Sequence, residues 1–144
     1  MVTVFCDTRE KKNSHVLAYF DRHNIQYELK KLDIGDYQTN IRPGRSIDRK
    51  RNLEELARNL CTKDKTRFWN EVRLAHKSGI KLIVLVEQNI DGIEGVKSWN
   101  SKYSKITGKY LANEIYKCHI AYGTEFLFCS RRSTGKRIIQ LLMG

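Results

Sequence analysis

The segment Ile80–Val86, with the sequence IKLIVLV, places the strongest constraint on how this chain can fold. Its apolar residues do not alternate with polar ones, and Lys81 is the one exception. A strand with one face in water alternates apolar and polar side chains, whereas a strand covered on both faces does not. We therefore expect a central strand with other elements packed on both sides of its sheet.

The rest of the chain alternates between strand and helix patterns. Runs of β-branched and aromatic residues indicate strands, and apolar residues three and four positions apart indicate helices. The expected strands are 2–6, 25–29, 36–41, 45–50, 80–86 and 124–129. The expected helices begin at Asn13 or Ser14, at Asn52, near 64 and before Leu111, and a last one carries Ile138, Ile139 and Leu142. Residues 88–106 are expected to form a loop. This order predicts an α/β fold in which one mixed central sheet is flanked by helices.

The segment Gly35–Lys50 predicts two short strands joined by a Pro-Gly turn. Asp36 lies on the first strand, and Asp48 and Lys50 lie on the second. Residues two apart in a strand share a face, so Asp48 and Lys50 point the same way. Converging carboxylates can hold Mg²⁺ or Mn²⁺ for phosphodiester hydrolysis, while the lysine orients or deprotonates a bound water. The alternative is a surface hairpin whose charged side chains are those of an ordinary solvent-exposed edge strand, with no catalytic role.

The register of this hairpin decides whether the two carboxylates meet. A turn symmetric about Pro43-Gly44 would pair position 48 with 39 and leave Asp36 roughly 10 Å away along the strand. Direct opposition of Asp36 and Asp48 requires a pairing centre near Arg42. We therefore predict an asymmetric turn or a bulge near Gly44, or a bend at Gly35 that turns Asp36 inward.

The charge of the chain points to a polyanionic partner. With 27 Lys and Arg against 16 Asp and Glu, the net charge is +11, which favours nucleic acid first and an anionic membrane second. The chain has no apolar run near the ~20 residues that a membrane span needs, and its N-terminal sequence lacks the features of a secretory signal. The cysteines and histidines lack zinc-site spacing. We expect an intracellular protein, in the cytoplasm of a microbe or virus-infected cell or in a nucleus.

The hairpin resembles the nuclease signature of the XPF/Mus family of structure-specific endonucleases, GD-x(n)-ERK-x3-D. Gly35-Asp36 matches its first part, Asp48-Arg49-Lys50 its second, and Glu54 stands at the final acidic position. The segment Asp7-Thr8-Arg9-Glu10 resembles the D-x-R-E motif that closes the family's first strand. The resemblance covers essentially the whole chain. It implies one XPF-type nuclease domain over residues 1–144, with a restriction-endonuclease-like core and no helix-hairpin-helix or helicase domain.

The resemblance implies that Asp36 and Asp48 are ligands for Mg²⁺ or Mn²⁺, with the backbone carbonyl of Arg49 as a further ligand. It implies that Lys50 activates the attacking water and that Asp7 is an additional acidic group at the metal. Asp48 stands where the family usually has Glu. Its carboxylate is one methylene shorter, so metal preference and activity are left open.

Three further acids have weaker implied roles. Glu10 and Glu54 are expected either to support the metal ligands from behind or to pair locally with basic residues. Glu87 ends the predicted buried strand, where it can lie near the site or be an ordinary solvated acid.

Basic residues are expected to bind the phosphates of a nucleic acid. The resemblance implies that Arg9 and Arg49 bind phosphate or order the site. Basic residues around the hairpin and in the segment 97–109 add a phosphate track: Arg42, Arg45, Arg49, Arg51, Lys102 and Lys105. Trp99 and Tyr103 in that segment either stack on exposed bases or pack back onto the core.

These features predict a metal-dependent endodeoxyribonuclease for branched DNA such as flaps, forks or junctions, as formed in DNA repair and recombination. A nuclease-like module that binds DNA without cutting it, or serves as an inactive partner subunit, is the alternative. A third interpretation, a basic RNA-binding protein, rests on charge alone. Both a homodimer and a complex with a partner protein remain open.

Overall fold

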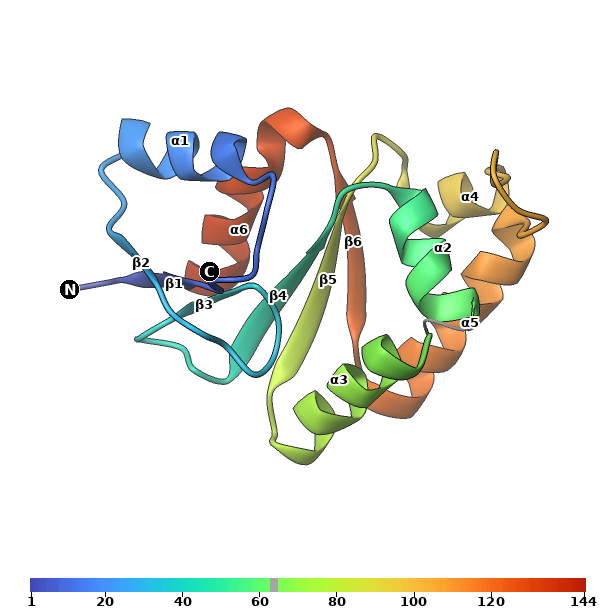
Figure 1. The fold of residues 1–144 in the computed structure, drawn as a ribbon, viewed down its shortest axis with the longest axis horizontal. Helices are drawn as coiled ribbons and strands as arrows, with labels where there is room; N and C mark the ends of the chain where they lie inside the picture. Colours follow the sequence, from blue (N-terminus) through green and yellow to red (C-terminus); the bar gives the residue numbers. More distant parts are fainter. Residues whose placement is uncertain (63–64) are drawn as a thin grey trace.

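The computed structural model describes residues 1–62 and 65–144. A six-stranded sheet runs through the middle of the molecule, with the strand order β2-β1-β3-β4-β5-β6 (Figure 1). Its strands are β1 (Val4–Cys6), β2 (Tyr27–Leu29), β3 (Tyr37–Thr39), β4 (Arg45–Lys50), β5 (Lys81–Glu87) and β6 (Glu125–Cys129). The β1–β2, β4–β5 and β5–β6 pairs are parallel, and the β1–β3 and β3–β4 pairs are antiparallel. The predicted mixed sheet is confirmed.

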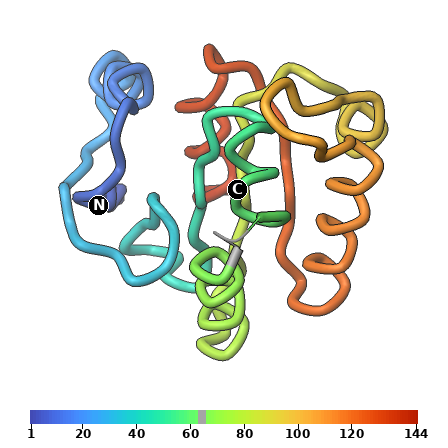
Figure 2. The backbone as a smooth tube through the Cα atoms, turned by 45° about the vertical axis from the view of Figure 1, so that its right-hand side comes forward, coloured from blue at the N-terminus to red at the C-terminus, as the bar shows by residue number. Residues whose placement is uncertain are grey.

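Helices cover both faces of this sheet. They are α1 (Ser14–Arg22), α2 (Leu53–Cys61), α3 (Lys65–Lys77), α4 (Gly92–Lys97), α5 (Gly108–Tyr122) and α6 (Thr134–Met143), the last preceded by the 3-10 turn η1 (Arg131–Ser133). Figures 1 and 2 show α1 in blue and α5 in orange on opposite sides of the molecule, with the strands between them. The predicted start of α3, near 64, falls on a position outside the described residues. None of the helices in the described ranges is long and apolar enough to cross a membrane.

Strand β5 separates two hydrophobic cores. Leu82, Val84 and Val86 belong to the core shared with α2, α3 and α5. Ile83 and Leu85 belong to the core shared with α1 and α6. Each face of the strand therefore has its own apolar partners, which explains why its sequence does not alternate. The prediction of a central strand covered on both faces is confirmed.

The expected loop at 88–106 is wrong in part, because it contains the short helix α4. Two glycines weaken the helical signal of this segment, since glycine is a poor helix former. Packing overrides that preference, because Val96 is completely buried. Gly95 is also tightly packed, since a Cβ atom there would lie 2.7 Å from Cβ of Ile90. The isolated bridge between Asn100 and Thr107 then closes the remainder of the segment into a compact loop.

The hairpin formed by β3 and β4 is asymmetric about its Pro-Gly turn. Tyr37 pairs with Ile47, which centres the hairpin on Arg42. Asp36 directly precedes this pair, and its amide donates to the carbonyl of Ile47, so it lies beside Asp48. The predicted off-centre turn is therefore confirmed, and it removes the separation of roughly 10 Å that a symmetric turn would create.

Candidate active site

Gly35 brings Asp36 against the neighbouring strand β4. The backbone of Gly35 is left-handed, with φ of +73°, and a Cβ atom there would lie 2.1 Å from Oγ of Ser46. Only glycine fits both the conformation and the close approach. The amide of Asp36 then donates to the carbonyl of Ile47 at 2.6 Å, and its Oδ2 accepts from the amide of Arg49 at 2.8 Å. Asp36 is thus fixed beside β4 by the backbone itself.

Asp48 and Lys50 lie on the same side of β4, as predicted from their spacing. Nζ of Lys50 lies 3.2 Å from Oδ2 of Asp48. The ammonium group also stands over the ring of Phe68 from α3, 5.1 Å from its centre. These two contacts hold the long lysine side chain in one place, directed at the carboxylates.

Glu71 of α3 is a third carboxylate at this site, and our interpretation of the sequence missed it. Its Oε2 accepts from the amide of Gly35 at 3.3 Å, and it lines the same cavity as Asp48. The signal was present, because Phe68, Val72 and Ala75 form the buried stripe of this helix. Glu71 follows Phe68 by three positions and therefore lies beside that stripe.

Burial and mutual repulsion shape the electrostatics of the site. Burial first, and then Asp48 and Glu10, hold the pKa of Asp36 well above its usual range. Burial and the neighbouring Asp48 likewise raise the pKa of Glu71 to about 8. Burial acts to lower the pKa of Lys50, but Asp48 and Asp36 outweigh it, so this pKa lies above its ordinary value. The group therefore favours a bound cation, and Lys50 remains charged near neutral pH.

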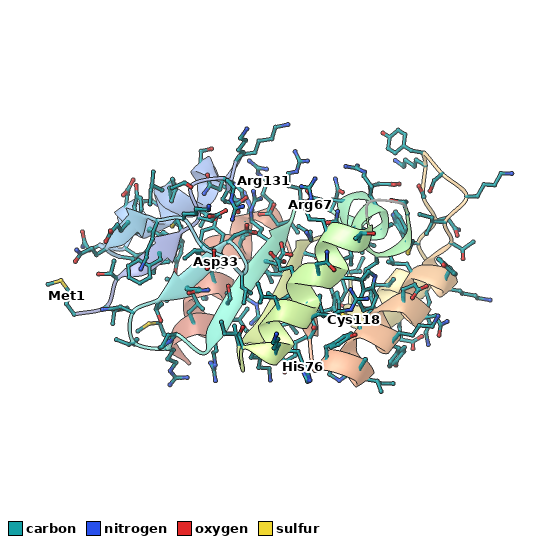
Figure 3. The ribbon with its side chains drawn as sticks, turned by 60° about the horizontal axis from the view of Figure 1, so that its bottom comes forward. Met1, Asp33, Arg67, His76, Cys118 and Arg131 are labelled. Atoms are coloured by element: carbon teal, nitrogen blue, oxygen red, sulfur yellow. The ribbon has the colours of Figure 1, made fainter. Side chains whose placement is uncertain are left out.

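The site opens into a cavity of about 630 Å³ between the hairpin and the helices α2 and α3. Asp36, Asp48, Lys50 and Glu71 all line it. Its border carries three arginines from three parts of the chain: Arg9 after β1, Arg58 on α2 and Arg67 on α3. Arg67 of α3 and Asp33, in the loop before β3, also line this cavity, and both are labelled in Figure 3. Arg58 and Arg67 were not predicted, since nothing in their local sequence separates them from other exposed arginines.

Asp7 supports the site from beside it. Its Oδ1 accepts from the amide of Leu32 at 2.9 Å, and its Oδ2 accepts from Nε of Arg9 at 3.0 Å. The amide of Asp7 donates to the carbonyl of Asp36 at 2.8 Å. Asp7 is not among the residues that line the cavity, whereas Arg9 is. These contacts fit a residue that orders the loop around Asp36 and orients Arg9.

Arg49 lies on the opposite face of the sheet from Asp48 and Lys50. Its Nε is 2.7 Å from Glu10, its Nη1 is 2.6 Å from Glu87, and its side chain is 1% exposed. Glu87 also accepts from Thr134 at 2.6 Å and contacts Nε2 of His15. The guanidinium of Arg49 is thus held by protein partners, and Arg49 lines the smaller of the two cavities near the site, not the larger. Neither Glu10 nor Glu87 lines the larger cavity, although Glu10 lines the smaller one.

Arg42 and Arg45 lie toward the turn end of the hairpin. Both donate to the backbone carbonyl of Gly144, and Arg45 also donates to the carbonyl of Leu141 at 2.8 Å. Neither lines the cavity. The structure therefore does not bring these two arginines to the site. The sequence alone could not show this, because their hydrogen-bond partners are about a hundred positions away along the chain.

The other predicted basic residues lie on the α2 side of the site. Arg51 lines a smaller cavity of about 250 Å³ that adjoins the first, since Arg9 and Glu55 line both. Glu54 holds the loop at 100–107, because it accepts from Oγ of Ser101 and from the amide of Lys102, each at 2.8 Å.

That loop leaves its basic side chains in solvent. Lys102 and Lys105 are exposed. The two predicted aromatic residues differ, because Trp99 packs against the core whereas Tyr103 is 85% exposed. Of these two aromatic residues, Tyr103 is therefore the one whose ring is available to stack on a base.

The donor set fits a hard divalent cation. Within the described residues, no group of three or more His, Cys, Asp or Glu side chains is arranged to hold a metal ion by itself. Mg²⁺, however, is usually held by one or two carboxylates and completes its shell with waters and substrate phosphates. Asp36 and Asp48 face the same open cavity and repel one another, so a cation between them would relieve that repulsion.

Comparisons with known proteins agree with this architecture. The sequence model of the ERCC4 domain matches residues 6–142. XPF from Aeropyrum pernix superposes with a TM-score of 0.73 at 18% identity, covering 97% of this chain and 63% of that one. XPF from Aeropyrum pernix in complex with DNA gives a TM-score of 0.74 at 17% identity, covering 99% of this chain and 64% of that one. No curated protein matches the sequence.

The chain therefore spans less than two thirds of the length of those two structures, with which it shares its fold. The family match extends over nearly all of the sequence, from the last residue of β1 onward, and includes the hairpin and α3. The resemblance to the XPF/Mus endonucleases is confirmed at the level of the family, and the chain belongs to the ERCC4 domain family.

Proposed function

We propose that this protein is a Mg²⁺- or Mn²⁺-dependent endonuclease that hydrolyses phosphodiester bonds in branched DNA. The observation that carries the proposal is the meeting of Asp36 and Asp48 across the hairpin, with Lys50 3.2 Å from Asp48 in the same cavity. Membership of the ERCC4 domain family supports a nuclease. The likeness to an XPF structure in complex with DNA supports DNA as the substrate.

Asp36 and Asp48 are the residues that would hold the cation, with the carbonyl of Arg49 as a further ligand. A bound Mg²⁺ or Mn²⁺ supplies a Lewis acid for a phosphate oxygen and lowers the pKa of a coordinated water. The amide of Arg49 already fixes one oxygen of Asp36, so this carboxylate keeps its orientation without metal. Asp7 acts indirectly, because its own oxygens bind the Leu32 amide and Arg9.

Lys50 contributes a fixed positive charge to the reaction. Its raised pKa means that it is protonated when the neighbouring carboxylates are ionised. A positioned ammonium group can orient the attacking water and stabilise the negative charge that develops on the phosphate. A cation that offset the carboxylate charges would weaken the attraction that raises this pKa, and Lys50 could then release its proton to solvent and serve as the base for the attacking water.

The cations around the cavity support binding of a phosphate backbone. Arg9, Arg58 and Arg67 line the same cavity as the carboxylates, and neutralising phosphates with such side chains gives sequence-independent affinity. The second cavity extends the track from Arg9 to Arg51. A branch point offers unpaired bases beside a duplex, and exposed Tyr103 can stack on them. Lys102 and Lys105 lie in the same loop as Tyr103.

The test is a cleavage panel with purified protein. Flap, fork and four-way junction DNA are incubated with Mn²⁺ or Mg²⁺, alongside single-stranded DNA, duplex DNA and RNA of the same sequence. Asp36→Asn and Lys50→Ala serve as the matched inactive variants, because each removes one group and leaves the hairpin backbone in place. The expected result is cutting of branched DNA by the unmodified protein alone.

Two outcomes contradict the proposal. If all branched substrates remain intact with either metal, while the protein binds DNA in a salt-dependent manner, the chain is a silent DNA-binding module or partner subunit. If both variants cut as fast as the unmodified protein, the activity belongs to a contaminant or to another site. The mass of the protein–DNA complex in solution separates a monomer, a homodimer and a need for a partner protein.

A further inference from the structure

Glu71 occupies an unusual place for an acid on a basic helix. It is the one acidic residue of α3, whose other charged residues are cationic. An isolated carboxylate on such a helix would be most stable at the surface, where water and nearby lysines or arginines solvate it. Glu71 is instead half-buried and lines the cavity that holds Asp36, Asp48 and Lys50.

The contacts of Glu71 reach both strands of the hairpin. Its Oε2 accepts from the amide of Gly35, the residue directly before Asp36, at 3.3 Å. It also lines the same cavity as Asp48, whose charge raises the pKa of Glu71. One side chain from α3 is therefore hydrogen-bonded to the residue before Asp36 and lies in the same cavity as Asp48. Like charges in such a poorly hydrated place repel one another, so the ionised form of Glu71 destabilises the metal-free protein.

We infer that Glu71 is a positioning residue for the metal-dependent reaction, which orients Asp48 and accepts hydrogen bonds from water carried by the cation. This inference rests on the proposed nuclease function. Mg²⁺ retains several of its waters in proteins, and those waters need acceptors. Partners that bind the ligands of a metal, and not the metal itself, typically change metal affinity by roughly 10- to 100-fold.

A purely structural role is the competing explanation. In that case the hydrogen bond from Gly35 to Glu71 anchors α3 to the hairpin and stabilises the fold. The two roles predict different effects of replacing the carboxylate. A structural anchor would be weakened, whereas a carboxylate retained for a cation would leave the metal-free protein at least as stable when it is replaced by a neutral group.

The experiment compares Glu71→Gln with the unmodified protein and with Glu28→Gln. Glutamine keeps an oxygen that can accept from the Gly35 amide, so the substitution removes the charge and little else. Glu28 is exposed on the edge strand β2, and its substitution makes the same change in net charge. Mn²⁺ affinity is measured by calorimetric titration, and stability by urea unfolding in the presence of EDTA.

We expect Glu71→Gln to bind Mn²⁺ at least about tenfold more weakly and to unfold, without metal, at a urea concentration no lower than that of the unmodified protein. Glu28→Gln should match the unmodified protein in both measurements. A Glu71→Gln affinity within about twofold of the unmodified protein would overturn the inference while leaving the nuclease proposal standing. Failure of the unmodified protein to bind Mn²⁺ would overturn the proposed function and this inference together.

Discussion

Replacing Gly35 by alanine should disrupt the site through its geometry alone. A Cβ atom at Gly35 would lie 2.1 Å from Oγ of Ser46 and 3.0 Å from the carbonyl oxygen of Ile47. The left-handed backbone, with φ of +73°, adds roughly 1 kcal/mol of strain for any L-residue. Relieving the clash requires moving Ser46, whose Oγ donates to the carbonyl of Ile34 at 2.6 Å. Losing that buried hydrogen bond and overpacking the turn add about 2–4 kcal/mol.

The total destabilisation expected for Gly35→Ala is therefore about 3–5 kcal/mol. Gly79 provides a matched control, since its φ is +72° and a Cβ atom there would meet nothing within 4 Å. Gly79→Ala should cost only the strain, about 1 kcal/mol. Urea unfolding monitored by circular dichroism gives both values.

The difference between the two alanine variants isolates the close approach of Gly35 to β4. It should shrink when Ser46→Ala removes the nearest atom, and a double-mutant cycle measures that coupling. Equal destabilisation by Gly35→Ala and Gly79→Ala, within about 0.5 kcal/mol, would refute the argument that contact with β4 positions Asp36.

Three further predictions concern pH, the buried network and DNA binding. The pKa of Glu71 is raised in the folded protein, to about 8. The stabilisation it contributes to the metal-free protein is therefore complete below about pH 4 and is lost as the pH rises through about 8. Urea unfolding in EDTA across this range should show a decline that Glu71→Gln reduces, and parallel curves would contradict the assignment. Arg49→Met should cost about 3–5 kcal/mol, because it leaves two buried carboxylates without their cation; a loss below 1 kcal/mol in the same unfolding assay would show that the network is not coupled to stability. Arg67→Ala should reduce the slope of log DNA affinity against log salt concentration by the equivalent of about one phosphate contact, whereas Arg42→Ala should leave this slope unchanged. Fluorescence anisotropy without metal measures the affinity. The reverse order would place the DNA at the other end of the hairpin.

Local sequence patterns were sufficient wherever one strand or helix determines the outcome. The lack of alternation in β5 predicted two cores, because each face of the strand meets its own helices. The spacing of Asp48 and Lys50 predicted their common face, since strand geometry fixes it. The register of the hairpin could be stated as a requirement, and the pairing of Tyr37 with Ile47 meets it.

Contacts between distant segments were beyond such reasoning. Arg49 could be assigned to the opposite face of β4, but its partners Glu10 and Glu87 are 39 and 38 positions away. Its burial therefore depended on how three elements pack together. Glu71 was missed for a related reason, because only the packing of α3 against the hairpin brings its carboxylate to Asp48.

The most direct test of the account is the single-turnover rate at which the protein cuts a flap substrate with Mn²⁺. Unmodified protein, Asp36→Asn and Lys50→Ala are compared at concentrations that saturate the DNA, so that binding does not limit the rate. Removal of a metal ligand or of a positioned charge should lower this rate by at least about 100-fold, while both variants still bind the DNA. Equal rates for the three proteins, or no cutting by the unmodified one, would contradict the assignment of Asp36, Asp48 and Lys50 as an active site.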